Sequence, residues 1–138
     1  MSLLSIFEVS GSALSAQNTR LNTTASNLAN AQSVAANPED TYRARHPVFA
    51  SRLQSEMDSQ SASVGVQVLG IVESEKPLEL RYEPHHPMAN EEGYVSYPNV
   101  NAVEEMANMI SASRAFQMNV EIMDSTRTLA ERLLTMGQ

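Results

Sequence analysis

The sequence has 138 residues, enough for one ordinary domain, and a formal net charge of −7. This negative charge argues against a nucleic acid or an anionic membrane as partner, because phosphate-rich surfaces repel an acidic protein. The absence of cysteine excludes disulfide bonds, thiol catalysis and cysteine-ligated zinc.

The N-terminal sequence lacks the features of a secretory signal. Met1–Glu8 has neither a basic start nor a long apolar run. The chain also has no stretch of about 18 apolar residues that would cross a membrane. On these features alone we expect a cytoplasmic protein, or one exported by machinery that reads something other than a cleaved signal.

Proline divides the chain into three segments. All six prolines lie between Pro38 and Pro98, and a proline inside a helix costs roughly 3 kcal/mol. Long helices are therefore allowed at both ends of the chain but not in its middle. We expect an N-terminal helical segment at 1–37, a β-rich middle segment at 38–98 with a loop at 54–63, and a C-terminal helical segment at 99–138.

In the first segment, large apolar residues recur every seven positions. The repeat consists of Phe7, Leu14, Leu21 and Leu28. This spacing is typical of the narrow contact seam of a coiled coil. It predicts a helix from about Leu3 to Ala31.

The last segment carries a longer repeat, in which the spacing alternates between four and three residues. Its members are Ala102, Met106, Met109, Ser113, Phe116, Val120, Met123, Arg127, Ala130 and Leu134. A sustained heptad seam predicts a second long helix. Asn101 is suited to cap its N-terminus, with Glu104 three residues on, and Gly137 stands where a C-terminal cap would.

The middle segment shows the two-residue alternation of β-strands. The predicted strands are Tyr42–Val48, Val64–Val72, Leu78–Tyr82 and Tyr94–Tyr97, separated by turns rich in proline, glycine and charge. The sequence therefore predicts an α+β protein, in which long N- and C-terminal helices form a coiled-coil pair beside a small antiparallel β-rich middle segment.

Asparagine recurs along the first predicted helix, at Asn18, Asn22, Asn27 and Asn30. Only Glu8 and Arg20 are charged before Glu39, whereas an exposed helix face usually carries Glu and Lys. A face of amides and hydroxyls can be buried if neighbours satisfy its hydrogen bonds. We therefore expect other helices, from further copies or other subunits, to surround this helix on most sides in a helical assembly. The alternative is a monomer whose terminal helices form a hairpin against a small sheet, which explains the seams but not the charge-poor face.

Two parts of the chain resemble signatures of the bacterial flagellar rod and hook proteins. Ser12–Asn22 followed by Ala25–Ala31 resembles the N-terminal signature, and Pro98–Met106 followed by Met109–Asn119 resembles the C-terminal one. Hook and distal-rod members have much larger middle segments. The compact middle of this chain, with its insertion after Ser33, is similar to that of a proximal rod protein.

The resemblance implies a structural subunit of the flagellar drive shaft. Such subunits assemble helically and reach the periplasm unfolded, through the flagellar type III export channel, without a cleaved signal peptide. Their terminal helices pack as an inner tube, with the middle segment outside. The implied partners are other copies of the chain, other rod proteins, basal-body ring and export-gate components, and the export machinery, with no nucleic acid and no stable membrane insertion. In the free subunit we expect poorly ordered terminal helices, because isolated helices are marginal in water.

The sequence gives little support for enzyme or metal chemistry. The histidines are His46, His85 and His86, and neighbours on an extended segment point to opposite sides, so His85 and His86 rarely bind one ion. Neither a nucleophile elbow nor a phosphate-binding glycine loop is present. We expect no cofactor and no catalytic residue. Two alternatives are another axial rod or hook-type subunit, and a small soluble domain with a metal or enzymatic site at His85–His86.

The predicted assembly interface combines the two heptad seams with the recurring amides. Its members are Phe7, Leu14, Asn18, Leu21, Asn27, Leu28, Asn30, Met106, Met109, Phe116, Asn119, Val120, Met123 and Leu134.

Overall fold

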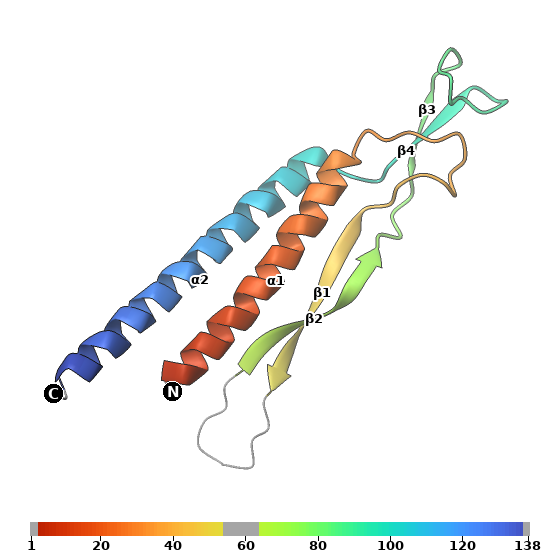
Figure 1. Ribbon diagram of the computed structural model, residues 1–138. Coiled ribbons are helices and arrows are strands. Elements are labelled where there is room, and N and C mark those ends of the chain that lie inside the picture. The colour runs from red at the N-terminus through yellow and green to blue at the C-terminus, as the bar shows by residue number, and fades with distance from the viewer. Residues whose placement is uncertain (1–2, 54–63, 137–138) are drawn as a thin grey trace.

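The computed structural model describes residues 3–53 and 64–136 and contains, in those ranges, two long helices and four strands (Figure 1). Helix α1 spans Leu3–Ala29 and helix α2 spans Ala102–Met136. The helices lie side by side and antiparallel, so both chain ends lie at the same end of the molecule. The predicted loop at 54–63 and the predicted cap at Gly137 lie outside the described residues.

The four strands form two separate antiparallel hairpins. Strand β1 (Arg45–Leu53) pairs with β2 (Val64–Glu73), and β3 (Glu79–Tyr82) pairs with β4 (Tyr94–Tyr97). Helix α1 lies between α2 and the β1–β2 hairpin, whereas the β3–β4 hairpin extends from the end of the helices opposite the termini (Figure 1). The predicted α+β class, with a helix pair and a small antiparallel β-rich middle, is confirmed.

The first strand begins later than the sequence pattern predicted, at Arg45 instead of Tyr42, and continues beyond Val48 to Leu53. Polar groups just before β1 form hydrogen bonds with loop residues and not with β2. The Thr41 hydroxyl donates to the carbonyl of Asn37, and the amide of Ala44 donates to the side chain of Asn99. The alternating residues before Arg45 therefore form an extended stretch that is hydrogen-bonded to neighbouring loops. The hydrogen-bond ladder between β1 and β2 begins only after this stretch.

Asn99 connects the helices to the two hairpins. Its Oδ1 accepts from the Ala44 amide at 2.8 Å, and its Nδ2 donates to the Lys76 carbonyl at 2.7 Å. A short antiparallel bridge between Ala35 and Ser96 joins the segment after α1 to β4. These bonds hold the end of α1, the start of α2 and both hairpins in one arrangement.

The N-terminus of α2 is capped as the sequence predicts. The Oδ1 atom of Asn101 accepts from the amides of Val103 and Glu104 at 3.0 and 3.3 Å. Two of the amides that lack a partner inside the helix are thereby satisfied.

The described part of the chain has a very small apolar core. The buried apolar residues are Ala16, Ala44, Val95 and Ala112, three of them alanines. Large apolar side chains remain exposed on α2 and on the β1–β2 hairpin. A chain of this length normally buries many more large side chains, so this fold leaves much of its apolar surface for contact with other molecules.

Candidate assembly surface

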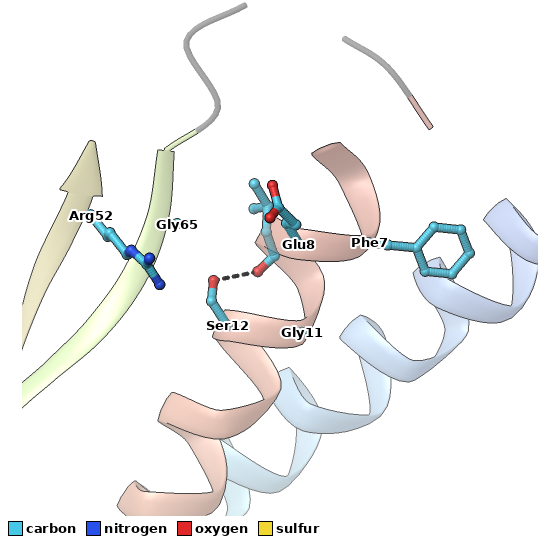
Figure 2. A pocket seen from close by; sticks show the side chains of 7 residues that line it. Phe7, Glu8, Gly11, Ser12, Arg52 and Gly65 are labelled. Atoms are coloured by element: carbon cyan, nitrogen blue, oxygen red, sulfur yellow. Dashed lines mark hydrogen bonds between the residues drawn. The ribbon is translucent and has the colours of Figure 1, made fainter. Parts of the chain in front are cut away.

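The contact between α1 and α2 uses the predicted heptad seams. The large residues of the α1 repeat are half-buried, and the ring of Phe7 points toward α2 (Figure 2). On α2 the seam residues Met109, Phe116 and Met123 are also half-buried. One hydrogen bond at 3.0 Å, from Arg20 Nη2 to Asn108 Oδ1, crosses between the helices. Half of the predicted interface residues thus lie on the seams of a helix pair within a single chain, which leaves part of each side chain uncovered.

Four of the predicted interface residues remain exposed. They are Asn18, Met106, Val120 and Leu134. The Asn18 side chain accepts a hydrogen bond from Asn22 at 3.0 Å, so the two amides satisfy one another on the helix surface. These side chains are accessible to a neighbouring molecule.

Two other predicted amides bind their own helix. The Nδ2 atom of Asn30 donates to the Ser26 carbonyl, and that of Asn119 donates to the Ala115 carbonyl, both at 2.8 Å. Both residues are half-buried. The structure does not bring either amide into a hydrogen bond with the opposite helix.

Asn27 has a different role from the predicted one. Its side chain is completely buried, with 0% exposure, and it bonds to Arg45 and Tyr42 of the same chain. A side chain enclosed in this way has no surface to offer to another subunit. Asn27 is therefore an internal connection between α1 and the start of β1.

The charge-poor face of α1 is also partly covered from within the chain. The Ser12 hydroxyl accepts from the Val66 amide of β2 at 3.1 Å, and the Ser26 hydroxyl lies 3.2 Å from the hydroxyl of Tyr42. On the side that meets the β1–β2 hairpin, the chain itself covers α1. On that side the helix-hairpin alternative describes the molecule better.

Sequence reasoning missed a second apolar seam on α2, on a different side from the one that faces α1. This outer α2 seam consists of Met118, Ile122, Leu129, Leu133 and Met136, all of them exposed. Their spacings of four, seven, four and three are those of a helix stripe. The stripe is present in the sequence, but its spacing is less regular than that of the inner repeat.

The end of α2 extends beyond α1. Helix α2 has 35 residues and α1 has 27, and the end of α1 lies beside the start of α2 (Figure 1). At 1.5 Å per residue, α2 is longer by about 12 Å, and this excess projects past the start of α1. We call Leu129–Met136 the α2 overhang. It explains why Leu134, although on the predicted seam, is 75% exposed.

A notch lies between the start of α1 and the end of the β1–β2 hairpin formed by the last residues of β1 and the first of β2 (Figure 2). Its volume is about 330 Å³, and its lining includes Glu8, Gly11 and Ser12 from α1 with Arg52 and Gly65 from the hairpin. Glu8 and Arg52 are both exposed, and neither forms an ion pair within the part of the chain that the structure describes.

The histidines do not form a metal site among the described residues, where no group of three histidine, aspartate or glutamate side chains is placed to hold an ion. His86 Nδ1 accepts a hydrogen bond from the Met88 amide at 3.1 Å, which uses one ring nitrogen in a local turn. Neither described helix is both long and apolar enough to cross a membrane.

A helix pair with so small an apolar core and an exposed outer seam is typical of a subunit that neighbouring molecules complete. Comparison with known proteins agrees with this class. Residues 7–36 match a family described as flagella basal body rod protein, and residues 91–136 match one described as flagellar basal body rod FlgEFG protein C-terminal.

Relatives similar over the full length make the assignment specific. Flagellar basal-body rod protein FlgC of Salmonella typhimurium is 46% identical over 138 residues, and that of Yersinia enterocolitica is also 46% identical, each with complete coverage of both chains. FlgC of Borreliella burgdorferi is 32% identical and covers 100% of this chain and 99% of its own. The chain therefore belongs to the FlgC family of flagellar basal-body rod proteins. It is a structural subunit of the flagellar basal body, where it associates with other rod and basal-body components.

Proposed function

We propose that this subunit assembles helically in the proximal rod through its paired terminal helices, α1 and α2. In this proposal the segments 1–37 and 99–138 form the helical core of the rod, and 38–98 packs outside it. The chain passes through the flagellar type III export channel without a cleaved signal peptide and takes its place in the periplasm. Its contacts there are with further copies, other rod proteins, and ring and export-gate components.

The observation that carries this proposal is the imbalance between buried and exposed apolar side chains. The buried hydrophobic core of the described residues consists of three alanines and one valine, whereas α2 exposes large apolar side chains along its length from Val103 to Met136. Each large apolar side chain removed from water contributes about 1.5–3 kcal/mol. Burial of these residues between subunits therefore supplies the free energy for assembly.

The proposal assigns no catalytic role to the chain. The described residues supply acidic side chains mainly at the surface, in exposed pairs such as Arg81 with Glu79 and Arg127 with Glu131. Arg81 donates a hydrogen bond to Glu79, and this bond together with the negative charge of Glu79 raises the pKa of Arg81 above its usual value. Such groups solvate a surface and stabilise hairpins and helices.

The test is incorporation into basal bodies. We expect Leu21→Asp and Phe116→Asp to abolish both incorporation and swimming, because each places a charge in the partly buried contact between the helices. Gln117→Asp, next to Phe116 but exposed, is the matched control and should assemble normally. A chelator should leave assembly unchanged. Normal basal bodies that contain either seam variant would contradict the proposal.

A further inference from the structure

We propose that the α2 overhang of one copy packs against the outer face at the start of α1 in a second copy, at the edge of the notch. This inference rests on the proposed assembly and identifies which surfaces of two copies meet.

The overhang continues an interface that already exists within the chain. The four-and-three spacing of the inner seam runs on through Arg127, Ala130 and Leu134, past the point where α1 begins. On this continued seam Leu134 is 75% exposed, and the outer α2 seam adds the exposed side chains of Leu133 and Met136 on another side of the overhang. A helix surface that has paired with a helix along most of its length is suited to pair with another of the same kind over its last two turns.

The start of α1 offers a surface suited to receive these side chains. Its outer face presents Glu8, Gly11 and Ser15 at heptad spacing, and a Cβ atom added at Gly11 would meet no atom within 4 Å. Small residues let another helix approach closely. The adjoining notch of about 330 Å³ is roughly twice the ~150 Å³ cavity that accommodates one benzene-sized group. Leucine and methionine side chains from a neighbour therefore have room to enter.

The charges of the two surfaces are complementary. Glu8 is the only charged residue in α1 before Arg20, and Arg132 lies between Leu129 and Leu133 on the overhang. Neither side chain forms an ion pair among the described residues. Within one chain the two residues lie on opposite sides of the point where α1 begins, separated by about 13 Å along the helix axes at 1.5 Å per residue. Glu8 can pair with Arg132 only if the arginine comes from another copy.

A contact between two different surfaces of identical chains leaves one unused surface on each partner. Such a heterologous contact propagates to further copies instead of closing as a symmetric dimer. Successive copies are therefore added in one direction, because the overhang of each copy packs against α1 of the next.

The test uses the natural absence of cysteine from the chain. The double variant Ser15→Cys with Leu133→Cys should form disulfide-linked multimers of the chain in assembled basal bodies after mild oxidation. Ser15→Cys with Leu80→Cys is the control, because β3 lies at the far end of the molecule (Figure 1), and it should remain unlinked. Absence of multimers, or links only to a different basal-body protein, would overturn the assignment to a second copy.

Charge reversal provides an independent measurement. Glu8→Arg or Arg132→Glu alone should cause loss of swimming, and the combined variant should recover it. Normal swimming by both single variants, or loss without recovery in the combined variant, would overturn the Glu8–Arg132 contact. Incorporation of Leu21→Asp reports separately on the proposed function, so the failure of one proposal can be told from that of the other.

Discussion

The side chain of Asn27 pairs with both backbone polar groups of Arg45. Its Nδ2 donates to the Arg45 carbonyl oxygen at 2.8 Å, and its Oδ1 accepts from the Arg45 amide nitrogen at 2.9 Å. The hydroxyl of Tyr42 donates to the same Oδ1 at 2.9 Å. Because Asn27 is completely buried, these bonds are shielded from water and fix the place where the chain leaves α1 and enters the β1–β2 hairpin.

We expect Asn27→Ala to destabilise the folded subunit strongly. The change leaves the amide and carbonyl of Arg45 without their partner, and each buried polar group left unpaired costs about 1–3 kcal/mol. The free energy of unfolding, measured by urea denaturation of the purified chain, should fall by at least the cost of one such group.

Asn22→Ala is the control for this measurement. Asn22 is exposed, and its side chain bonds only to Asn18 on the same helix, so its removal should change stability by about 0.5 kcal/mol or less. Equal effects of the two substitutions would show that the pairing of Asn27 with Arg45 is not important for the fold.

Asn27 also shows where sequence reasoning reaches its limit. The heptad repeats predict both helices well, because a period near 3.5 residues reports directly on a helix with one contact face. The Asn27 pattern indicates a buried amide but cannot name its partner, since Arg45 is 18 positions away. The sequence pattern therefore favoured a neighbouring subunit as the partner of Asn27, whereas the partner is the chain's own hairpin. The predicted start of β1 was three residues early because the sequence also does not show which polar groups bond outside the hairpin.

The assembly surface also has one part that the sequence predicts and one part that it does not. The periodicity of the inner seams predicts helix contacts, yet it does not distinguish a partner in the same chain from one in another. The α2 overhang follows from the unequal lengths of two helices placed side by side, a relationship that exists only in three dimensions. For this reason Leu134 could be assigned to a seam from the sequence, while its lack of an intrachain partner could not.

The packing of α1 on β2 should be sensitive to the pair Ser12 and Gly65. A Cβ atom added at Gly65 would lie 3.1 Å from the Ser12 Oγ, which also accepts from the Val66 amide. We expect Gly65→Ala to destabilise the chain, because the hydroxyl must move and its hydrogen bond weakens. Combined with Ser12→Ala, which removes that hydroxyl, the Gly65→Ala change should cost less than it does alone.

A double-mutant cycle on the free energy of unfolding measures this coupling. Residues in contact typically show an interaction energy of about 0.5 kcal/mol or more. Strictly additive effects would mean that the hairpin does not press on Ser12 at this point.

Gly93 should tolerate no side chain. It has a φ of +82°, and an added Cβ atom would lie 2.9 Å from the ring of Tyr82. We expect Gly93→Ala to lower the stability of the β3–β4 hairpin by roughly 1–3 kcal/mol, because both backbone strain and a steric clash oppose it. Amide hydrogen exchange of Tyr82 and Tyr94, whose strands pair there, measures the local effect.

Gly70→Ala is the matched control in the other hairpin. No atom lies within 4 Å of a Cβ placed there, and its φ is not in the left-handed region. It should leave exchange in β3 and β4 unchanged. Faster exchange of Tyr82 and Tyr94 in this control would show that the effect does not depend on the backbone at Gly93.

In the free subunit we expect proteolysis to begin at the α2 overhang. Proteases cut where a helix end opens locally at low cost, and an end without packing partners opens most easily. Trypsin should therefore cleave after Arg132 and Arg127, which are exposed, before it cleaves after Arg20, which is half-buried and bonded to Asn108. Limited digestion with mass readout, beside a light-scattering mass of the dilute protein, gives the order of cleavage on a monomer.

The same sites should be protected in isolated basal bodies, where a neighbouring copy covers the overhang. Early cleavage after Arg20 on a monomer would instead mean that the helix pair forms only on assembly. That outcome would agree with the sequence-based expectation of poorly ordered terminal helices in the free subunit.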